Sequence, residues 1–514
     1  PGTALHEGID WEWETFPEFL DAIERKEFVM DLGFMIGHGP VRSYVMGYDR
    51  CQNQVDASKD EINQMSEIVE KAINAGALGF STSRTILHRD IHGVYVPGTE
   101  ASSEEMKELA FAVDRAGEGT LEIVSDWLDQ EIEMSWMKEY VEKSDCGLTV
   151  LQTNGDSVKT ILYCEEQFLK GKNVRPQFPG RNVGLMFGLE SSLHPFIGHP
   201  SYKEISHLPL NERLSIMRDP AFKQKILNES PSFREDLQKA AKEQKSNKTK
   251  EEIKAEAEIG KKLISNYETQ FILSDPPNYE PTREDSIAYL AEQRNQSEEE
   301  VIYDELIKDD GKSLIYACFT PYENHKLKFV ETFYKLKSSV AGGSDGGAHC
   351  GLICDASMPT TNLSHWARDR SAGNKIPLEL IIRKQTKDTA ETYGLFDRGE
   401  IKTGMIADIN IIDFEKLNVS LPKMIFDLPK GGKRLVQESF GYLATIKSGE
   451  VVYENGQATG TLPGQVIRGK QTSEAKDTKE KISFYDRTVR LFIVKFLRLI
   501  WAARNKPVKS TVIS

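Results

Sequence analysis

Residues 344–349, Ser-Asp-Gly-Gly-Ala-His, combine an acid and an imidazole at a spacing that could support chemistry. A run of small and apolar residues, 339–343, comes directly before them and is typical of a buried strand. Parallel sheets place catalytic groups just past the carboxyl ends of their strands, and glycines there allow a ligand to approach closely. Asp345 is therefore a candidate metal ligand or general base, with His349 within one turn of it. The alternative is a glycine-rich turn in which Asp345 only occupies a turn position.

A second apolar run, residues 28–36, ends in the sequence Gly-His-Gly-Pro at 37–40. His38 in this position could bind a metal ion, or it could cap a loop. Arg42 follows four residues later and could hold a substrate carboxylate through two parallel hydrogen bonds. A surface or structural arginine is the alternative for Arg42.

Two further apolar runs, 121–124 and 148–151, are followed by the polar residues Asp126 and Gln152. Aspartate is an acceptable zinc ligand, whereas glutamine is a poor one. Asp126 therefore joins His38 and Asp345 as a candidate metal ligand.

Four other histidines fall in segments that we interpret chiefly as structural. His88 and His92 lie in a loop that follows the apolar run 76–80. His194 and His199 lie in a proline-containing segment that we expect to form a loop over the mouth of the domain.

Strand-like runs alternate with amphipathic helical segments along most of the chain. The runs lie near residues 32, 77, 121, 148, 174, 314 and 340. Two of the helices begin with the pattern of an N-terminal capping box, Ser58 with Glu61 and Ser102 with Glu105. This alternation predicts βαβ units, an α/β fold and a parallel sheet. Seven strands are one fewer than a closed (β/α)8 barrel contains, as expected if the chain begins inside the domain.

We therefore predict an N-terminally truncated barrel domain over residues 1–399, with a helical insertion at about 200–306. Within the insertion, residues 239–262 are rich in Lys, Glu and Ala, which indicates a solvated helix or a flexible excursion. Residues 400–468 contain short apolar runs and the hairpin dipeptide Asn-Gly at 455–456. This composition predicts a small β module after the barrel.

Charge and cysteine content exclude some functions. The chain has 514 residues and a net charge of −14, which argues against a nucleic-acid partner. Its 39% hydrophobic content and 28% charged content are those of a folded globular protein. Six cysteines are scattered without a Cys-x-x-Cys pair, so free thiols and a reducing, cytoplasmic location are expected.

Residues 469–514 form a charged linker and a tail of different character. The tail from 481 to 514 has eight Lys or Arg against one Asp, a net +7, which leaves −21 for the residues before it. Residues 483–506 place basic side chains on one helical arc and apolar side chains on the other. This pattern predicts a basic amphipathic helix that binds an anionic membrane surface or a partner, or that packs on its own domain.

Several motifs occur together in an order that is typical of one family. They are Gly-His-Gly-Pro-Val-Arg at 37–42, Gly-Ala-Leu-Gly-Phe-Ser-Thr at 76–82, the stretch 344–349, Tyr-Gly-Leu-Phe-Asp-Arg-Gly at 393–399, Gly-Met-Ile-Ala-Asp at 404–408 and Pro-Gly-Gln-Val-Ile-Arg at 463–468. Over about residues 1–470 the sequence resembles the amidohydrolase superfamily, in its D-aminoacylase (N-acyl-D-amino-acid deacylase) branch.

The resemblance implies a zinc-dependent (β/α)8 barrel with a small β-sandwich, which hydrolyses the C–N bond of N-acyl-D-amino acids. Relatives hydrolyse cyclic amides of the dihydropyrimidinase and hydantoinase kind, which is the alternative substrate class. Zinc would activate water, and a carboxylate at the last strand would move its proton to the leaving nitrogen. The resemblance implies that Asp345 is the catalytic acid/base and a neighbour of the metal. From the residues themselves we expect His38 and Asp126 as further metal ligands. We expect substrate contacts from Arg42, Ser344, Gly346 and His349. The oligomeric state is left open.

The sequence departs from the family at the metal site. The family has a His-x-His pair on its first strand, and this chain contains no His-x-His. Its mid-barrel strands end in histidines, whereas the corresponding runs here end at Asp126 and Gln152. Asp126, Gln152 or His38 would have to substitute for them. A barrel that has lost its metal site and binds ligands without catalysis is therefore a further hypothesis.

Overall fold

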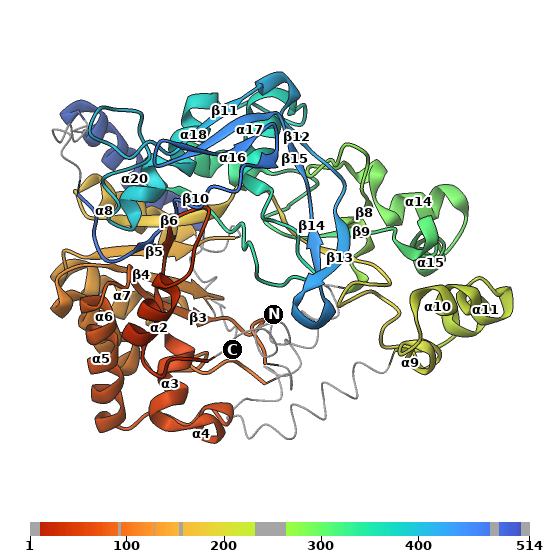
Figure 1. Ribbon diagram of the computed structural model, residues 1–514, viewed down its shortest axis with the longest axis horizontal. Helices are drawn as coiled ribbons and strands as arrows, with labels where there is room; N and C mark the ends of the chain where they lie inside the picture. The colour runs from red at the N-terminus through yellow and green to blue at the C-terminus, as the bar shows by residue number, and fades with distance from the viewer. Residues whose placement is uncertain are drawn as a thin grey trace, which may run out of the picture.

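The computed structural model describes residues 11–90, 94–127, 129–153, 158–231, 264–472 and 483–504. Its centre is a six-stranded sheet in which all neighbouring strands are parallel, in the order β10-β6-β5-β4-β3-β2 (Figure 1). The strands are β2 (Ile36–Gly37), β3 (Gly79–Arg84), β4 (Thr120–Ser125), β5 (Gly147–Leu151), β6 (Val174–Pro179) and β10 (Val340–Gly342). The predicted α/β fold with a parallel sheet is confirmed.

One face of this sheet is covered by the helices that follow its strands (Figure 1). These helices are α3 (His38–Met46), α5 (Lys59–Asn74), α6 (Ser103–Ala116), α7 (Gln130–Lys143) and α8 (Val158–Leu169). Alternate strand residues, including Phe80, Leu121, Ile123 and Leu148, pack against them in one apolar core. Side chains alternate between the two faces of a strand. The intervening residues, Glu122 and Gln177 among them, therefore project from the opposite, more polar face.

The two predicted capping boxes have different outcomes. Ser58 accepts from the backbone N–H of Glu61, and the Glu61 side chain accepts from the backbone N–H of Ser58, so α5 has a complete capping box. Ser102 accepts from the backbone N–H of Glu105 in the same way. The Glu105 carboxylate, however, pairs with His38 and Arg42, because their positive and donor groups lie beside it in the core.

The strand predicted near residue 314 is not part of the parallel sheet. β9 (Ile315–Thr320) pairs antiparallel with β7 (Val183–Phe187) on one side and β8 (Gln270–Ile272) on the other. Antiparallel neighbours need no crossover helix, so the chain can return to β7 directly after the long insertion. Within the described residues the parallel sheet is therefore open.

The insertion is largely helical and forms the lobe at the right of Figure 1. Its helices are α9 (Pro200–Ile205), α10 (Leu210–Met217), α11 (Pro220–Leu227), α14 (Ile287–Arg294) and α15 (Glu298–Leu306). They share an apolar core of their own with β7 and β9. The charged run 239–262 lies outside the described residues.

The chain continues through four helices into a group of short antiparallel strands. The helices are α16 (Lys328–Lys335), α17 (Met358–Ser364), α18 (Leu378–Gln385) and α19 (Lys387–Thr392). A four-stranded antiparallel sheet contains β11 (Ile409–Ile412), β16 (Tyr442–Lys447), β17 (Glu450–Glu454) and β18 (Gln457–Ala458). The other strands pair as β12 (Asn418–Val419) with β15 (Ser439–Phe440), and β13 (Lys423–Leu428) with β14 (Gly432–Val436). Asn455 and Gly456 both have positive φ, 48° and 79°, as the predicted hairpin between β17 and β18 requires.

Both ends of the described chain return to the main body. β1 (Leu32–Gly33) pairs in parallel with β19 (Val466–Ile467), and α2 (Phe16–Glu24) contacts β19. α20 (Phe484–Arg504) lies against α8 at the edge of the molecule (Figure 1). None of the helices in the described residues has the length and apolar content needed to cross a bilayer.

Candidate active site

The loop after β10 holds Asp345 in an unusual backbone conformation at the carboxyl edge of the parallel sheet. Asp345 and His349 both have positive φ, 43° and 49°, a region that few non-glycine residues adopt. The backbone N–H of Ala348 donates to the Asp345 carbonyl at 2.9 Å, which closes a tight turn. Asp345 is exposed, so its carboxylate is available to a small molecule. Strained residues of this kind cluster at functional sites.

His349 lies beside His88, whose position in the loop after residues 76–80 predicts a chiefly structural role. The rings of His88 and His349 are 6.0 Å apart between centroids. Ser83, near the carboxyl end of β3, has its Oγ 2.6 Å from His88 Nδ1 and so orients that ring. Burial lowers the pKa of His88, and His349 acts in the same direction, whereas Asp345 and Asp126 oppose the shift. The structure thus brings Asp345, His349 and Asp126 near one another and adds His88.

Asp126 has a structural contact of its own. Its Oδ2 accepts from the backbone N–H of Ile86 at 2.8 Å, just before His88 in the chain. This hydrogen bond ties the end of β4 to the loop that follows β3, and so holds His88 next to the Asp345 loop. One carboxylate oxygen of Asp126 is therefore already committed to the protein.

A half-buried acid, Glu122, lies on the polar face of the sheet. Glu122 accepts from Gln177 Nε2 at 3.0 Å and from the Tyr393 hydroxyl at 3.3 Å. Burial raises the pKa of Glu122, and the charge of Asp345 contributes in the same direction. A Cβ on Gly342 would lie 2.7 Å from Gln177 Oε1, so a larger residue there would have to displace the Gln177 amide. One sequence feature points to Glu122: it is an acid inside an otherwise apolar strand-like run.

Asp355 is a buried acid near Asp345. Its Oδ1 accepts from Arg181 at 2.9 Å, and its Oδ2 has no hydrogen-bond partner within the described residues. Burial raises the pKa of Asp355 to about 6; Asp345 adds to the rise, and Arg181 opposes it. The guanidinium of Arg181 stacks on the ring of Tyr279 at 3.6 Å, which fixes the pair in place. The charge of Asp345 therefore raises the pKa of two other carboxyl groups, Glu122 and Asp355.

The predicted pair His38 and Arg42 lies in a different place, inside the core between α3 and α6. His38 Nδ1 is 2.9 Å from Thr82 Oγ1, and His38 Nε2 is 2.8 Å from Glu105 Oε1. Arg42 Nε donates to the same Glu105 oxygen at 2.8 Å, and a second nitrogen donates to the Val55 carbonyl. Both side chains are at most 2% exposed. A metal role for His38 or a substrate role for Arg42 would require this network to break.

The metal-binding potential of the site can be tested on its residues. Within the described ranges, no three His, Cys, Asp or Glu side chains come close enough together to hold a metal ion. His38 is committed to Thr82 and Glu105, and Asp126 uses one oxygen for a backbone contact. The described residues therefore do not fit the zinc site that the sequence resemblance implies.

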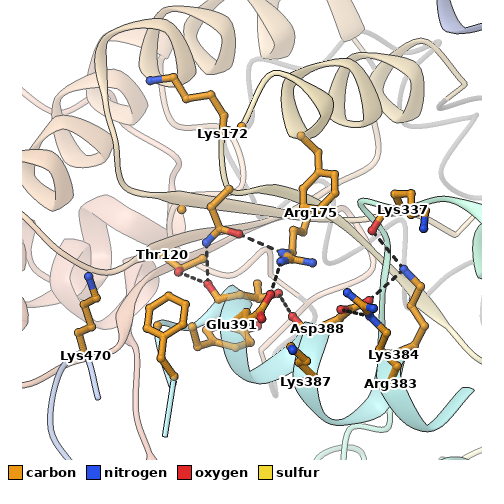
Figure 2. A pocket seen from close by; sticks show the side chains of 18 of the residues that line it. Thr120, Lys172, Arg175, Lys337, Arg383, Lys384, Lys387, Asp388, Glu391 and Lys470 are labelled. Atoms are coloured by element: carbon orange, nitrogen blue, oxygen red, sulfur yellow. Dashed lines mark hydrogen bonds and ion pairs between the residues drawn. The ribbon is translucent and has the colours of Figure 1, made fainter. Parts of the chain in front are cut away.

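A large groove of about 1210 Å³ lies at the opposite, amino edge of the sheet (Figure 2). It is bordered by the starts of β4, β5 and β6, by α18 and α19, and by the first turns of α20. Several of its cations are paired within the protein. Arg175 contacts Glu391 at 3.1 Å, and Arg383 and Lys384 contact Asp388 at 3.0 and 3.3 Å.

Lys384 shows the structural role of this groove most clearly. Its ammonium group also donates to the carbonyl of Leu336 at 2.8 Å, and so fastens α18 to the segment that leads into β10. Burial lowers the pKa of Lys384 to about 8, with Asp388 opposing the shift. Thr120 Oγ1 donates to the Thr392 carbonyl at 2.7 Å and closes the same edge. We therefore place the candidate active site at the carboxyl edge.

Comparison with known proteins supports the resemblance found in the sequence. The amidohydrolase family model matches residues 329–453, which include the Asp345 loop and the motifs at 393–408. The D-aminoacylase of Alcaligenes xylosoxydans xylosoxydans is 30% identical over 109 residues, 21% of this chain and 20% of that protein. The aligned region thus spans about a fifth of the enzyme's length. An uncharacterized protein of Mycobacterium tuberculosis is 20% identical over 473 residues, 87% of this chain and 72% of the relative.

Solved structures show a similar fold. A crystal structure of D-aminoacylase, described as defining a novel subset of amidohydrolases, matches with a TM-score of 0.51 and 18% identity. A second structure, from work on the binuclear metal centre of D-aminoacylase, matches with a TM-score of 0.52 and 18% identity. Each match covers 92% of this chain and 78% of the other. These structures show that the fold is similar to that of D-aminoacylase, and the family model and the sequence match support the resemblance to the amidohydrolase superfamily, in its D-aminoacylase branch.

Proposed function

We propose that this relative of the D-aminoacylase branch is a hydrolase of amide bonds that acts on N-acyl-D-amino acids. The observation that carries the proposal is the position of Asp345, exposed on a positive-φ turn at the carboxyl edge of the sheet. His88 and His349 lie beside it, and its charge raises the pKa of the half-buried Glu122 and of the buried Asp355. Perturbed ionisable groups that gather at one place are typical of catalytic sites.

The chemistry that we assign to these residues is proton transfer. An ionised Asp345 can accept a proton from water as it attacks the amide carbonyl, and can return it to the leaving nitrogen. Ser344, Gly346 and His349 belong to the same loop as Asp345. We propose that the backbone of Ser344 and Gly346 and the side chain of His349 contact the acyl group or the carboxylate of the substrate. A cyclic amide would present the same C–N bond and is the alternative substrate.

The metal cofactor is a separate part of the proposal. The related D-aminoacylase has a binuclear metal centre, and this supports a metal ion in a catalytically competent form of the present protein. Zinc is the metal that we propose, because a bound zinc ion activates water near neutral pH. The described residues do not supply three ligands for a metal ion. The proton transfer that we propose for Asp345 therefore does not depend on a bound metal.

We also propose the finer architecture and location. The open six-stranded sheet would be part of a (β/α)8 barrel over residues 1–399, the strands of 400–468 would form a sandwich module, and 469–514 a linker and tail. The similar fold of D-aminoacylase supports the barrel. A cytoplasmic location is supported by Cys51, Cys146, Cys164, Cys318, Cys350 and Cys354, all free thiols.

The experiment that tests the function combines hydrolysis and elemental analysis. N-acetyl-D-amino acids, their L-enantiomers and dihydropyrimidines are offered to the purified chain, with and without added zinc. Asp345→Asn should lower kcat/KM by about a thousandfold, while the thermal midpoint stays at the wild-type value. Asp369→Asn, an exposed acid on a different segment, is the matched control and should keep full activity. Undiminished hydrolysis by Asp345→Asn would contradict the assignment.

A non-catalytic barrel is the second candidate function. It is favoured by the commitment of His38 and Arg42 to a buried network and by the lack of a metal-binding group within the described residues. In that case the purified chain should contain no stoichiometric zinc and hydrolyse none of the substrates, although an N-acyl amino acid could still raise its thermal midpoint. Hydrolysis that is lost in Asp345→Asn would exclude this candidate.

A further inference from the structure

The C-terminal helix α20 is attached to the body through its basic side. Arg498 pairs with Glu166 of α8, and Arg490 lies 4.0 Å from Glu165 of the same helix. Val494, between these two arginines, is 4% exposed and packs inward. Burial alone would raise the pKa of Glu166, but Lys170 and Arg498 hold it below its ordinary value. The basic arc predicted from the sequence therefore faces α8 rather than solvent at these positions.

The apolar side of α20 faces away from the protein. Successive residues of an α-helix are about 100° apart, and the arc opposite Val494 is continuous from residue 489 to 499. Its side chains are Phe492 and Leu499, each 70% exposed, Phe496 at 54%, Ile493 at 47%, Leu497 at 44% and Val489 at 38%. A surface helix of a globular protein normally has its apolar stripe on the core. α20 has the reverse orientation.

The exposed apolar arc of α20 indicates a binding surface. Scattered exposed apolar residues are ordinary, whereas a contiguous apolar strip on one element marks an interaction surface. The two aromatic rings at its centre, Phe492 and Phe496, are one helical turn apart and present a large area to any apolar phase. No part of the described chain covers them.

Charge identifies the class of partner. Lys495 and Arg487 are exposed on the same helix, and the tail from 481 to 514 carries a net +7 while the preceding residues carry −21. An anionic bilayer attracts such a tail and repels the acidic body, so the molecule would be oriented with α20 toward the lipid. A second copy of the helix would instead bring two positive tails together.

We propose that the outward face of α20 binds the surface of an anionic lipid bilayer, with the helix lying in the plane of the interface. Phe492, Phe496 and Leu499 would enter the boundary between headgroups and acyl chains. Lys495 would extend to the lipid phosphates from the edge of the apolar arc. The ion pairs of Arg490 and Arg498 with α8 would keep the folded domain attached to the membrane-bound helix.

Flotation of the full chain with vesicles tests this proposal. Wild-type protein should float with vesicles of equal parts phosphatidylcholine and phosphatidylglycerol, and much less with phosphatidylcholine alone. The triple variant Phe492→Ser, Phe496→Ser, Leu499→Ser should weaken binding to the anionic vesicles by about a hundredfold. The pair Arg487→Glu and Lys495→Glu should weaken it by about tenfold or more and leave binding to neutral vesicles unchanged.

The matched control removes three exposed apolar side chains elsewhere. Ile401→Ser, Phe426→Ser and Leu462→Ser, at positions 84%, 55% and 44% exposed, should leave flotation at the wild-type level. Because all substituted side chains are exposed, circular dichroism should be unchanged in every variant. Equal flotation of the wild type and the Phe492 triple variant would overturn the proposal. The proposal would also be overturned if the wild type were a dimer that does not bind vesicles and the triple variant were a monomer. The apolar face of α20 would then be an interface between two copies of the chain.

Discussion

The two edges of the parallel sheet carry charge in different ways. At the amino edge, around the groove of Figure 2, cations and acids pair with one another, as Lys384 and Arg383 do with Asp388. At the carboxyl edge, Asp345 is exposed, and its carboxylate forms no ion pair with any described residue. The groove at the amino edge has a volume of about 1210 Å³, yet the charges that border it stabilise the fold. A hollow is therefore a poor guide to function here, whereas charge that the protein leaves available is a better one.

The sharpest test of this comparison applies the same substitution to each edge. Asp388→Asn removes the acid that neutralises the buried Lys384 and should lower the free energy of unfolding by about 3 kcal/mol, because an unpaired buried charge is costly. Hydrolysis measured well below the midpoint should be unchanged. Urea unfolding and kcat/KM check the two parts separately. A stable Asp388→Asn protein without activity would reverse the roles that we assign to the edges.

Glu105 provides an effect of similar size, in the buried network that holds the predicted site residues His38 and Arg42. Glu105→Gln leaves Arg42 charged and buried with weaker acceptors, so the free energy of unfolding should fall by about 3 kcal/mol. Glu104→Gln is the control one residue away, on an exposed position of the same helix, and should change stability by less than about 0.5 kcal/mol. If Glu105→Gln were stable but lost bound metal or substrate, the His38 and Arg42 cluster would have to be reassigned to the active site.

The next prediction concerns Asp355, at the carboxyl edge. Its raised pKa should make the free energy of unfolding depend on pH, with a smaller effect than the two substitutions above. The pKa of Asp355 in the folded protein, about 6, lies above its ordinary value of 3.8. The folded state therefore binds more protons than the unfolded state between these values, and stability should fall as pH rises from about 4 to about 6. The loss should be about 1–3 kcal/mol and should disappear in Asp355→Asn. Unfolding midpoints in urea across this range measure it; an identical slope in the variant would remove Asp355 as the cause.

Local sequence patterns were sufficient for the repeated elements. Short strand-like runs predicted β3, β4, β5 and β6, and the serine caps predicted the starts of α5 and α6, because these features depend on neighbours in the chain. β9 was located as a strand but assigned to the wrong sheet. The strands with which β9 pairs, β7 and β8, depend on the path of the chain through the insertion. The residues of β9 itself, 315–320, carry no information about that path.

The candidate site could be predicted only where its residues are close together in the sequence. Asp345 and His349 are four residues apart and were found together. His38 was correctly expected at a strand end, but Thr82 and Glu105, its partners, lie 44 and 67 residues away. The position of His88 beside the Asp345 loop was not predicted either, because its neighbour His349 follows a strand at the other end of the sheet. Contacts of this length are set by the fold rather than by spacing.

The most direct test of the account is kcat/KM for an N-acyl-D-amino acid, measured for Asp345→Asn and Asp388→Asn in one assay with the wild type. The account predicts that Asp345→Asn loses about a thousandfold in kcat/KM with an unchanged unfolding midpoint, while Asp388→Asn keeps its activity and unfolds earlier. Activity retained by Asp345→Asn and lost by a folded Asp388→Asn would contradict the placement of the active site at the carboxyl edge.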